Sequence, residues 1–160
     1  MTSPMNTLPP APALLPMTHI DCEVRTLVSL GPGPYGERRY VPLGGGTVRG
    51  PELNGTLLEG GVDWQVNRAD GVLDIAAHYV IRAGDGALIE VQSQGMRHGP
   101  PAVMARLARG EAVARDQYFF RTLVRFTSGA PQWAHLNKVM AIACGQREAD
   151  WVRLDLYRLT

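Results

Sequence analysis

The sequence has few cysteines, little excess charge and no long apolar run. Its two cysteines, Cys22 and Cys144, lie far apart and form no Cys-x-x-Cys pair, which argues against a disulfide framework. Unpaired thiols suit a reducing compartment, so we expect a cytoplasmic protein. The formal net charge is only +1. The charge balance therefore gives no reason to expect nucleic acid or an anionic membrane surface as a partner.

Membrane and export signals are also missing. No run approaches the roughly 18 apolar residues of a membrane-spanning helix. The first basic residue is Arg25, so the start of the chain lacks the charged region of a signal peptide. Prolines interrupt its apolar stretch at Pro9, Pro10, Pro12 and Pro16. We expect residues 1–17 to form a flexible, proline-rich tail and residues 18–160 to form a single domain.

Glycine and proline, in contrast, are abundant, with 18 Gly and 12 Pro. They separate short runs rich in β-forming residues, and Asp70-Gly71 and Asp85-Gly86 are typical of tight hairpins. Gly44-Gly45-Gly46 is expected to be a turn. The pattern predicts strands at residues 19–30, 38–43, 47–49, 53–59, 62–68, 72–82, 87–93, 117–127, 138–144 and 150–159.

One segment departs from this pattern. Residues 101–108 place Val103, Met104 and Leu107 at helical spacing, and Gly110 is a candidate stop signal. Residues 131–136 are expected to be a loop or a single helical turn. Strands joined mainly by short hairpins predict an all-β, antiparallel up-and-down barrel with one short helix, because closure leaves no exposed edge. A two-sheet sandwich is the structural alternative.

An ordered set of short motifs resembles a known family. Its members are Gly36 to Pro51 (GERRYVPLGGGTVRGP), Leu53-Asn54-Gly55, Gly60 to Trp64, Tyr79, Asp85 to Ile89, Gly95, Tyr118-Phe119, Phe126, Leu136-Asn137 and Gly145. Together they are similar to the bacterial and fungal family called domain of unknown function 3237. The resemblance covers nearly all of residues 19–160 and implies a compact lipocalin-like β-barrel, with no general activity. This chain departs from the family pattern at His135, where members often carry Trp, and at Ala76, where an acidic residue is common.

Candidate site residues follow from strand alternation. Asp63 and Trp64 follow a glycine pair, where a carboxylate and an indole wall would suit a barrel mouth. A turn carboxylate and a core tryptophan are the structural alternative. On residues 72–82, His78 could act as a base near neutral pH. Tyr79, on the opposite face, could bind a ligand carbonyl. The alternative for His78 is a solvated side chain, and the alternative for Tyr79 is a packed side chain with its hydroxyl satisfied.

Further candidates come from elsewhere in the chain. An inward Arg39 would need a carboxylate or an anionic ligand, and an ion pair with Asp63 is the structural reading. Trp133, His135 and Asn137 would share a face if their segment were extended, with His135 as a proton shuttle and Asn137 as an oxyanion donor. Loop packing is the alternative. Tyr118 belongs to a core stripe that could also form a cavity wall.

We therefore predict a cofactor-independent enzyme that transfers protons on an apolar or aromatic oxygenated metabolite, as an isomerase, cyclase or lyase does. The candidate acid–base groups are Asp63, His78 and His135. Arg39, Trp64, Tyr79, Tyr118, Trp133 and Asn137 are the candidate ligand-binding residues. No metal or cofactor is expected, because the histidines show no metal-ligand spacing. A ligand carrier and an oligomerising interaction module remain alternatives, and strand alternation alone leaves open which faces point inward.

Overall fold

The protein, described here as a computed structural model over residues 8–160, is built almost entirely of β-strands. The strands are β1 (Leu14–Val24), β2 (Val28–Gly33), β3 (Gly36–Arg49), β4 (Gly55–Leu57), β5 (Val62–Asn67), β6 (Leu73–Ala83), β7 (Leu88–His98), β8 (Phe119–Thr127), β9 (Met140–Arg147) and β10 (Trp151–Leu159). The helical segments are α1 (Pro101–Ala108) and the 3₁₀ segments η1 (Arg115–Gln117) and η2 (Pro131–Lys138).

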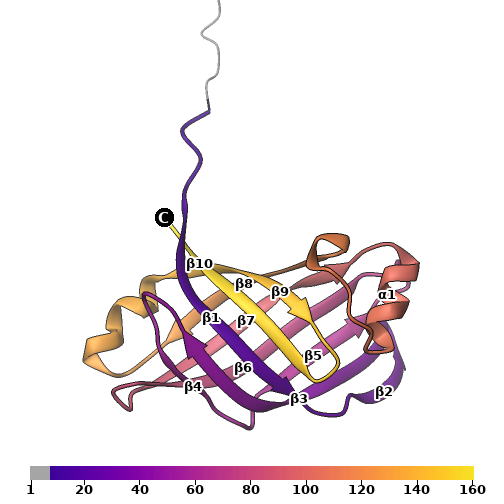
Figure 1. Ribbon diagram of the computed structural model, residues 1–160, viewed down its shortest axis with the longest axis horizontal. Helices are drawn as coiled ribbons and strands as arrows, with labels where there is room; N and C mark the ends of the chain where they lie inside the picture. Colours follow the sequence, from indigo (N-terminus) through magenta and orange to yellow (C-terminus); the bar gives the residue numbers. More distant parts are fainter. Residues whose placement is uncertain (1–7) are drawn as a thin grey trace, which may run out of the picture.

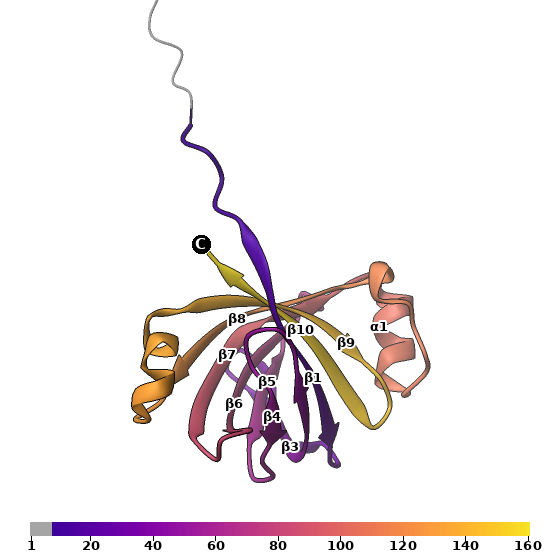
Figure 2. The ribbon, with the colours of Figure 1, turned by 60° about the vertical axis from the view of Figure 1, so that its left-hand side comes forward.

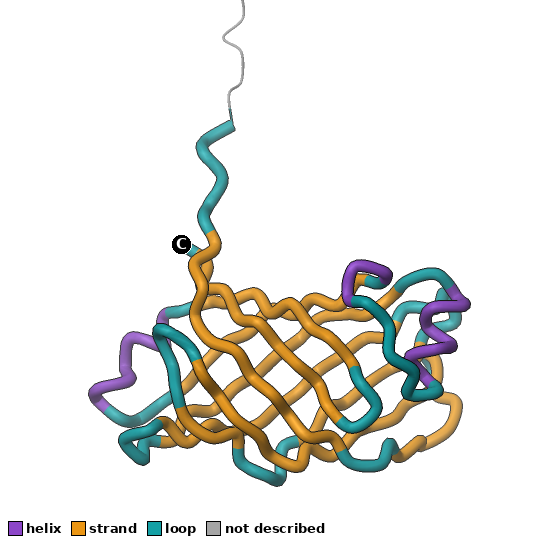
Figure 3. Tube along the Cα trace, viewed as in Figure 1, coloured by secondary structure: helices purple, strands orange, loops and turns teal. Residues whose placement is uncertain are grey.

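The strands form a closed antiparallel barrel, as expected. Strands β6 to β10 pair in chain order, and β1 pairs with both β10 and β3, which closes the sheet. Along the long strand β3, the first half pairs with β2 and β5 and the second half with β1 and β4. Strands β1 and β2 occupy one strand position in the wall, one after the other, and β4 and β5 do the same on the other side of β3. The ten strands therefore make an eight-strand barrel (Figures 1 and 3).

Local sequence signals account for several connections. Gly71 and Gly86, with φ values of 87° and 90°, turn the β5–β6 and β6–β7 hairpins in a conformation that other residues rarely adopt. Helix α1 begins with Pro101 and ends as predicted, with Gly110 at φ 76°. The N–H of Gly110 donates to Leu107 O and that of Glu111 donates to Arg106 O, which is a Schellman motif.

The two ends of the barrel are covered differently (Figures 1 and 2). Segment η2 lies at one end, where Leu136 is buried in the core. The interior near that end is apolar, and each of the following side chains is less than 2 % exposed: Met17, Ile20, Val48, Leu53, Ile81, Ile89 and Leu156. The α1–η1 segment lies at the other end, where β7 ends and β8 begins. Polar side chains enter the interior there.

The strand boundaries differ from the sequence prediction in several places: β7 and β9 extend beyond their predicted ends to His98 and Arg147, and two differences change how strands are divided. The predicted strand at 19–30 is divided at residues 25–27 into β1 and β2. The expected turn at Gly44-Gly45-Gly46 lies within β3 instead, because Gly45 (φ 92°) allows a bend while the ladder with β1 and β4 continues on its far side.

The expected tail also differs in part. Residues 1–7 lie outside the described part of the chain, but β1 begins at Leu14 and Met17 is fully buried. The sequence pattern underestimates this strand because Pro16 interrupts its apolar run, whereas the β1–β10 ladder accommodates the proline by shifting register between Pro16 and Thr18. Within residues 8–160, no helix combines the length and apolar character needed to cross a membrane.

Candidate functional site

A cavity occupies the half of the barrel nearest α1. The space open to the centre of a water molecule is about 50 Å³. Its wall is mainly apolar and includes Val24, Val41, Leu43, Leu57, Ile75, Ala77, Phe120, Val152 and Leu154. Its polar lining comprises Cys22, Asp63, Gln65, Tyr79, Ser93, Arg97, Thr122 and Arg147.

Asp63 projects into this cavity from β5, between Val41 of β3 and Ala77 of β6. One carboxylate oxygen, Oδ2, accepts a hydrogen bond of 2.7 Å from Gln65 Nε2, and Gln65 Oε1 in turn accepts one of 2.9 Å from Arg39 Nε. The other oxygen, Oδ1, is buried and has no partner. Burial raises the pKa of Asp63 to about 6, against the lowering effects of Gln65 and the nearby arginines. This carboxyl group can therefore both give and take a proton near neutral pH.

Tyr79 and Cys22 share the cavity with Asp63. The Tyr79 hydroxyl is buried without a hydrogen-bond partner, and burial raises its pKa well above the usual value. Tyr79 therefore stays protonated and can donate a hydrogen bond to a ligand. Burial also raises the pKa of the Cys22 thiol to about 12, which keeps it protonated and makes it a poor nucleophile.

Arg97 and Arg147 bring positive charge to the same space. Arg97 is only 8 % exposed, its Nε has no partner, and its guanidinium lies 5.7 Å from the centre of the Phe120 ring. Burial lowers the pKa of Arg97 to about 10, which still leaves it charged at neutral pH. Arg147 is half-buried, and its Nη1 donates to Trp151 O at 3.3 Å. Within residues 8–160, neither arginine forms an ion pair with a carboxylate.

The three buried polar atoms without partners lie at one place. Among the described residues they are Asp63 Oδ1, Tyr79 Oη and Arg97 Nε, and all three residues line the cavity. A buried polar atom without a partner costs roughly 1–3 kcal/mol. A ligand with an oxygen acceptor for Tyr79 and Arg97 and a hydroxyl donor for Asp63 would satisfy them, so this clustering marks the cavity as the candidate site.

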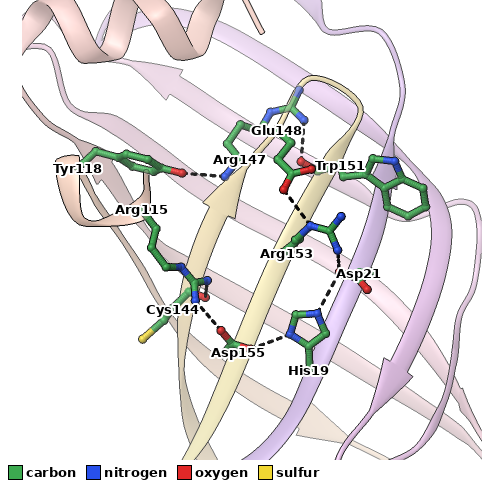
Figure 4. Close-up of polar contacts among 10 residues, drawn as sticks. All are labelled: His19, Asp21, Arg115, Tyr118, Cys144, Arg147, Glu148, Trp151, Arg153 and Asp155. Atoms are coloured by element: carbon green, nitrogen blue, oxygen red, sulfur yellow. Dashed lines mark hydrogen bonds and ion pairs between the residues drawn. The ribbon is translucent and has the colours of Figure 1, made fainter. Parts of the chain in front are cut away.

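Charged residues on the outer surface fasten the α1–η1 segment to the barrel (Figure 4). Arg115 of η1 donates to Asp155 Oδ2 of β10 at 2.7 Å. His19 of β1 lies between two carboxylates, 2.6 Å from Asp155 Oδ1 and 2.9 Å from Asp21 Oδ1. The hydrogen bond to Asp155 raises the pKa of His19. Arg153 also contacts Asp21, at 2.7 Å, which extends the network across β1 and β10.

Four of the predicted site residues meet at this end of the barrel. Asp63 and Tyr79 line the cavity, and Arg39 reaches Asp63 through Gln65. The expected ion pair between Arg39 and Asp63 is thus replaced by a bridge through an amide. Tyr118 is buried, and its hydroxyl accepts a hydrogen bond of 2.9 Å from the Arg147 backbone N–H (Figure 4).

Two predicted residues lie on the outside of the wall. His78 is exposed on the outer face of β6, where its Nε2 lies 2.8 Å from Glu90 Oε2. Trp64 also faces outward, with its ring centre 4.9 Å from that of Tyr40 and Arg38 stacked on it at 4.7 Å. Since neighbours in a strand point to opposite faces, the inward positions of Asp63 and Tyr79 require both outward positions.

The remaining predicted residues lie in η2, far from the cavity. Trp133 and His135 stack at 5.9 Å, and Trp133 Nε1 donates to Asp85 Oδ2 at 2.9 Å. Asn137 Oδ1 accepts from the Ser128 N–H, and its Nδ2 donates to Ser128 O. The shared face expected of an extended segment does not exist, because these residues form a 3₁₀ segment that begins at Pro131.

Most of the polar lining was not predicted as part of a site, including Gln65, Arg97 and Arg147. Strand alternation is the sequence pattern that could have identified these residues. Gln65 has the same parity as Asp63, and Arg97 follows the buried positions Val91 and Ser93 on β7. A charged residue at an inward position near the end of an apolar strand face was the pattern that could have found both arginines.

Fold and site together define the class as a small closed antiparallel β-barrel with an interior cavity that is polar at one end. The chain belongs to the family described as "Protein of unknown function (DUF3237)", whose sequence profile matches residues 12–159. It is similar to a UPF0311 protein of Rhodopseudomonas palustris, with 32% identity over 140 residues that cover 88% of this chain and 92% of the relative. These findings confirm the resemblance found in the sequence motifs.

Solved structures share the barrel. A conserved protein of unknown function from Rhodopseudomonas palustris matches with a TM-score of 0.89 and 30% identity, covering 96% of this chain and 100% of the other. A beta-barrel like protein from Acinetobacter baumannii matches with a TM-score of 0.82 and 32% identity, covering 96% and 99%. An enzyme from Penicillium herquei has the same fold, with a TM-score of 0.74, 20% identity and coverage of 98% and 100%.

Proposed function

We propose that this protein is a cofactor-independent enzyme that transfers protons on a small oxygenated metabolite bound in the barrel cavity, with Asp63 as the acid–base group. One observation carries the proposal: Asp63 Oδ1, Tyr79 Oη and Arg97 Nε, all buried and without partners, line the same cavity. Their hydrogen-bonding capacity is available to a ligand, and the apolar wall strengthens electrostatic interactions with it.

The proposed step is abstraction of a proton from a carbon next to a carbonyl group. The C–H electron pair moves into the carbonyl to form an enolate, and the proton passes to Asp63 Oδ1. The Tyr79 hydroxyl donates to the enolate oxygen. Return of the proton to a different carbon gives an isomer, and loss of a leaving group from the enolate gives a lyase reaction. The Gln65–Arg39 bridge to Oδ2 leaves Oδ1 free for this role.

The size of the cavity limits the part of the substrate that enters. One water molecule needs roughly 10–15 Å³ by the same measure, so about 50 Å³ holds a group of only a few heavy atoms. A larger substrate, such as an aromatic one, would place only its reacting end in the cavity. The Penicillium herquei protein of the same fold is described as an enzyme, which is compatible with catalysis in such a barrel.

Hydrogen–deuterium exchange at carbon tests the proposal directly. A thermal-shift screen of small carbonyl compounds, acids and lactones would first supply binders. A ligand at 100 times its Kd stabilises a protein by about 2.7 kcal/mol. Each binder would then be incubated with the protein in D₂O and followed by mass spectrometry. We expect protein-dependent exchange whose rate at low substrate concentration rises with pH through about 6, as Asp63 ionises.

Variants test whether Asp63 is the acid–base group. Asp63→Asn keeps the side-chain shape and an acceptor for Gln65, so it should still bind the compound but lose exchange by at least 100-fold, the usual contribution of a positioned base. His78→Gln and His135→Gln are matched controls outside the cavity and should exchange at the wild-type rate. Binding without exchange in the wild-type protein would support the carrier alternative, and exchange that depends on either histidine would contradict the assignment to Asp63.

A further inference from the structure

We infer that the ligand of this cavity is an organic carboxylate, held by Arg97 between Arg39 and Arg147 at the α1 end of the barrel. This inference rests on the proposed function and specifies its substrate class: an acid whose anionic group lies at the polar end and whose carbon body points toward the apolar wall.

The charges facing the cavity do not balance. Three guanidinium groups, those of Arg39, Arg97 and Arg147, act on Asp63, and each of them lowers its pKa. Asp63 is the one carboxylate in the cavity lining. Glu37 reaches Arg39 at 3.4 Å but is 38% exposed, so it lies toward solvent. Asp150, outside the lining, also acts on Arg147. Among the residues that line the cavity, two arginines, Arg97 and Arg147, face one carboxylate, so a bound anion would offset the remaining positive charge.

Arg97 is the best-placed receptor for that anion. Arg39 is engaged by Gln65 and Glu37, and Arg147 by Trp151 O. Arg97 Nε has no partner, and its guanidinium lies over the Phe120 ring, 5.7 Å from the ring centre. A planar guanidinium with a free edge matches a carboxylate through two parallel hydrogen bonds, whereas it matches a neutral amide or ketone through fewer.

The arrangement along the barrel gives the ligand its direction. Arg97 pairs across the sheet with Leu73 near the end of β7, while Ser93, two inward positions further along, pairs with Ala77 beside Asp63. A carboxylate on Arg97 would thus direct the adjoining carbons toward Asp63, Ala77 and Tyr79. A short acid with a reactive C–H bond near its carboxylate or carbonyl group fits both this direction and the small cavity.

A ligand-binding role and a structural role for Arg97 predict opposite effects of its removal on the stability of the ligand-free protein. An arginine that held the fold together would have carboxylate or carbonyl partners, and its removal would destabilise the protein. Arg97 has no ion pair within residues 8–160, so replacing it with a neutral side chain should leave the ligand-free protein at least as stable. Stability and binding of the same variant therefore separate the two roles.

The experiment compares acids with amides of the same shape. Calorimetric titrations would use crotonate against crotonamide and benzoate against benzamide, with the wild-type protein and with Arg97→Gln, Arg97→Lys and Arg121→Gln. We expect at least one acid to bind the wild-type protein tenfold or more tightly than its amide. Arg97→Gln should abolish this preference, and Arg97→Lys should retain part of it. Arg121→Gln removes the same charge from the outer face of β8 and should change nothing.

The outcomes separate this inference from the proposed function. Equal binding of acids and amides, with exchange that still depends on Asp63, would overturn the carboxylate assignment and leave the enzyme proposal intact. An acid preference without exchange would support the carboxylate site and contradict the enzyme. An Arg97→Gln variant that keeps the preference, or that unfolds more easily than the wild-type protein without ligand, would overturn the inference. Phenylphosphonate binding more tightly than benzoate would assign the site to phosphoryl groups instead.

Discussion

Replacing Asp63 with Asn should make the ligand-free protein more stable at neutral pH, and by an amount that depends on pH. Folding raises the pKa of this carboxyl group from 3.8 to about 6, so the folded state binds its proton more tightly than the unfolded state does. Below pH 3.8 the group is protonated in both states and contributes nothing. Between pH 3.8 and about 6 the unfolded state loses this proton while the folded state keeps it, so stability falls across that window and levels off above pH 6, where both states are ionised.

The size of the effect follows from the shift. A rise from 3.8 to about 6 corresponds to about 3 kcal/mol, at roughly 1.4 kcal/mol per pKa unit. The Asp63→Asn substitution would keep the acceptor for Gln65 and remove the charge, so the variant should gain about 3 kcal/mol at pH 8 and almost nothing at pH 4. In a domain of this size that is a rise in Tm of roughly 6–12 °C.

Urea unfolding of both proteins at pH 4, 5, 6, 7 and 8 measures this directly. The difference between the two proteins matters, because all other titrating groups contribute equally to both. Asp74→Asn, at an exposed carboxylate paired with Arg68 on the outer face, is the control and should show no such gain. Equal stability of Asp63→Asn and wild type at pH 8, or a loss in the variant, would refute the claim that the Asp63 carboxylate is buried at a cost.

Two further predictions concern packing and the surface network. Gly145→Ala should lower stability by about 1–3 kcal/mol in urea unfolding, because its Cβ would lie 2.6 Å from the Phe120 ring; Gly129→Ala, with no neighbour within 4 Å, is the control and should be nearly neutral. His19→Gln should reduce thermal stability most below pH 6.5, because His19 has a raised pKa and its charged form stabilises the fold until pH rises through that pKa. A difference that grows toward pH 9 would contradict the assigned role of His19.

Most of the fold could be predicted from local signals. Hairpin dipeptides, alternating apolar residues and the helix from Pro101 to Ala108 depend on neighbours in sequence, and the structure has them where they were expected. The register of β1 and the bend at Gly44–Gly46 could not be predicted in this way. Both depend on pairing between β1 and β3 across the closing seam, which is a long-range contact.

The site was predictable only in part, for a related reason. Alternation showed that Tyr79 and His78 face opposite ways, but the apolar set alone did not identify which polar residues enter the cavity. Arg97 shares its inward face with Val91 and Ser93, but the strand predicted at residues 87–93 ends before it, whereas β7 continues to His98 and buries the arginine. These polar groups come together because β3, β5, β7 and β9 bring them to one end of the closed barrel. The sequence pattern alone does not predict which strand ends lie side by side.

The remaining question is why a stable barrel keeps polar atoms without partners, and the rest of its interior supplies the argument. Other buried hydroxyls are satisfied: Thr18 donates to Leu53 O at 2.8 Å outside the cavity, and Ser93 donates to Thr122 Oγ1 at 2.7 Å within its lining. The half of the barrel near η2 packs apolar side chains that are less than 2 % exposed. Unpartnered atoms at Asp63, Tyr79 and Arg97 cost roughly 1–3 kcal/mol each. Their confinement to one cavity is expected if the apolar half near η2 stabilises the fold and a ligand supplies the missing hydrogen bonds in the cavity. The Asp63→Asn variant measures one part of that cost.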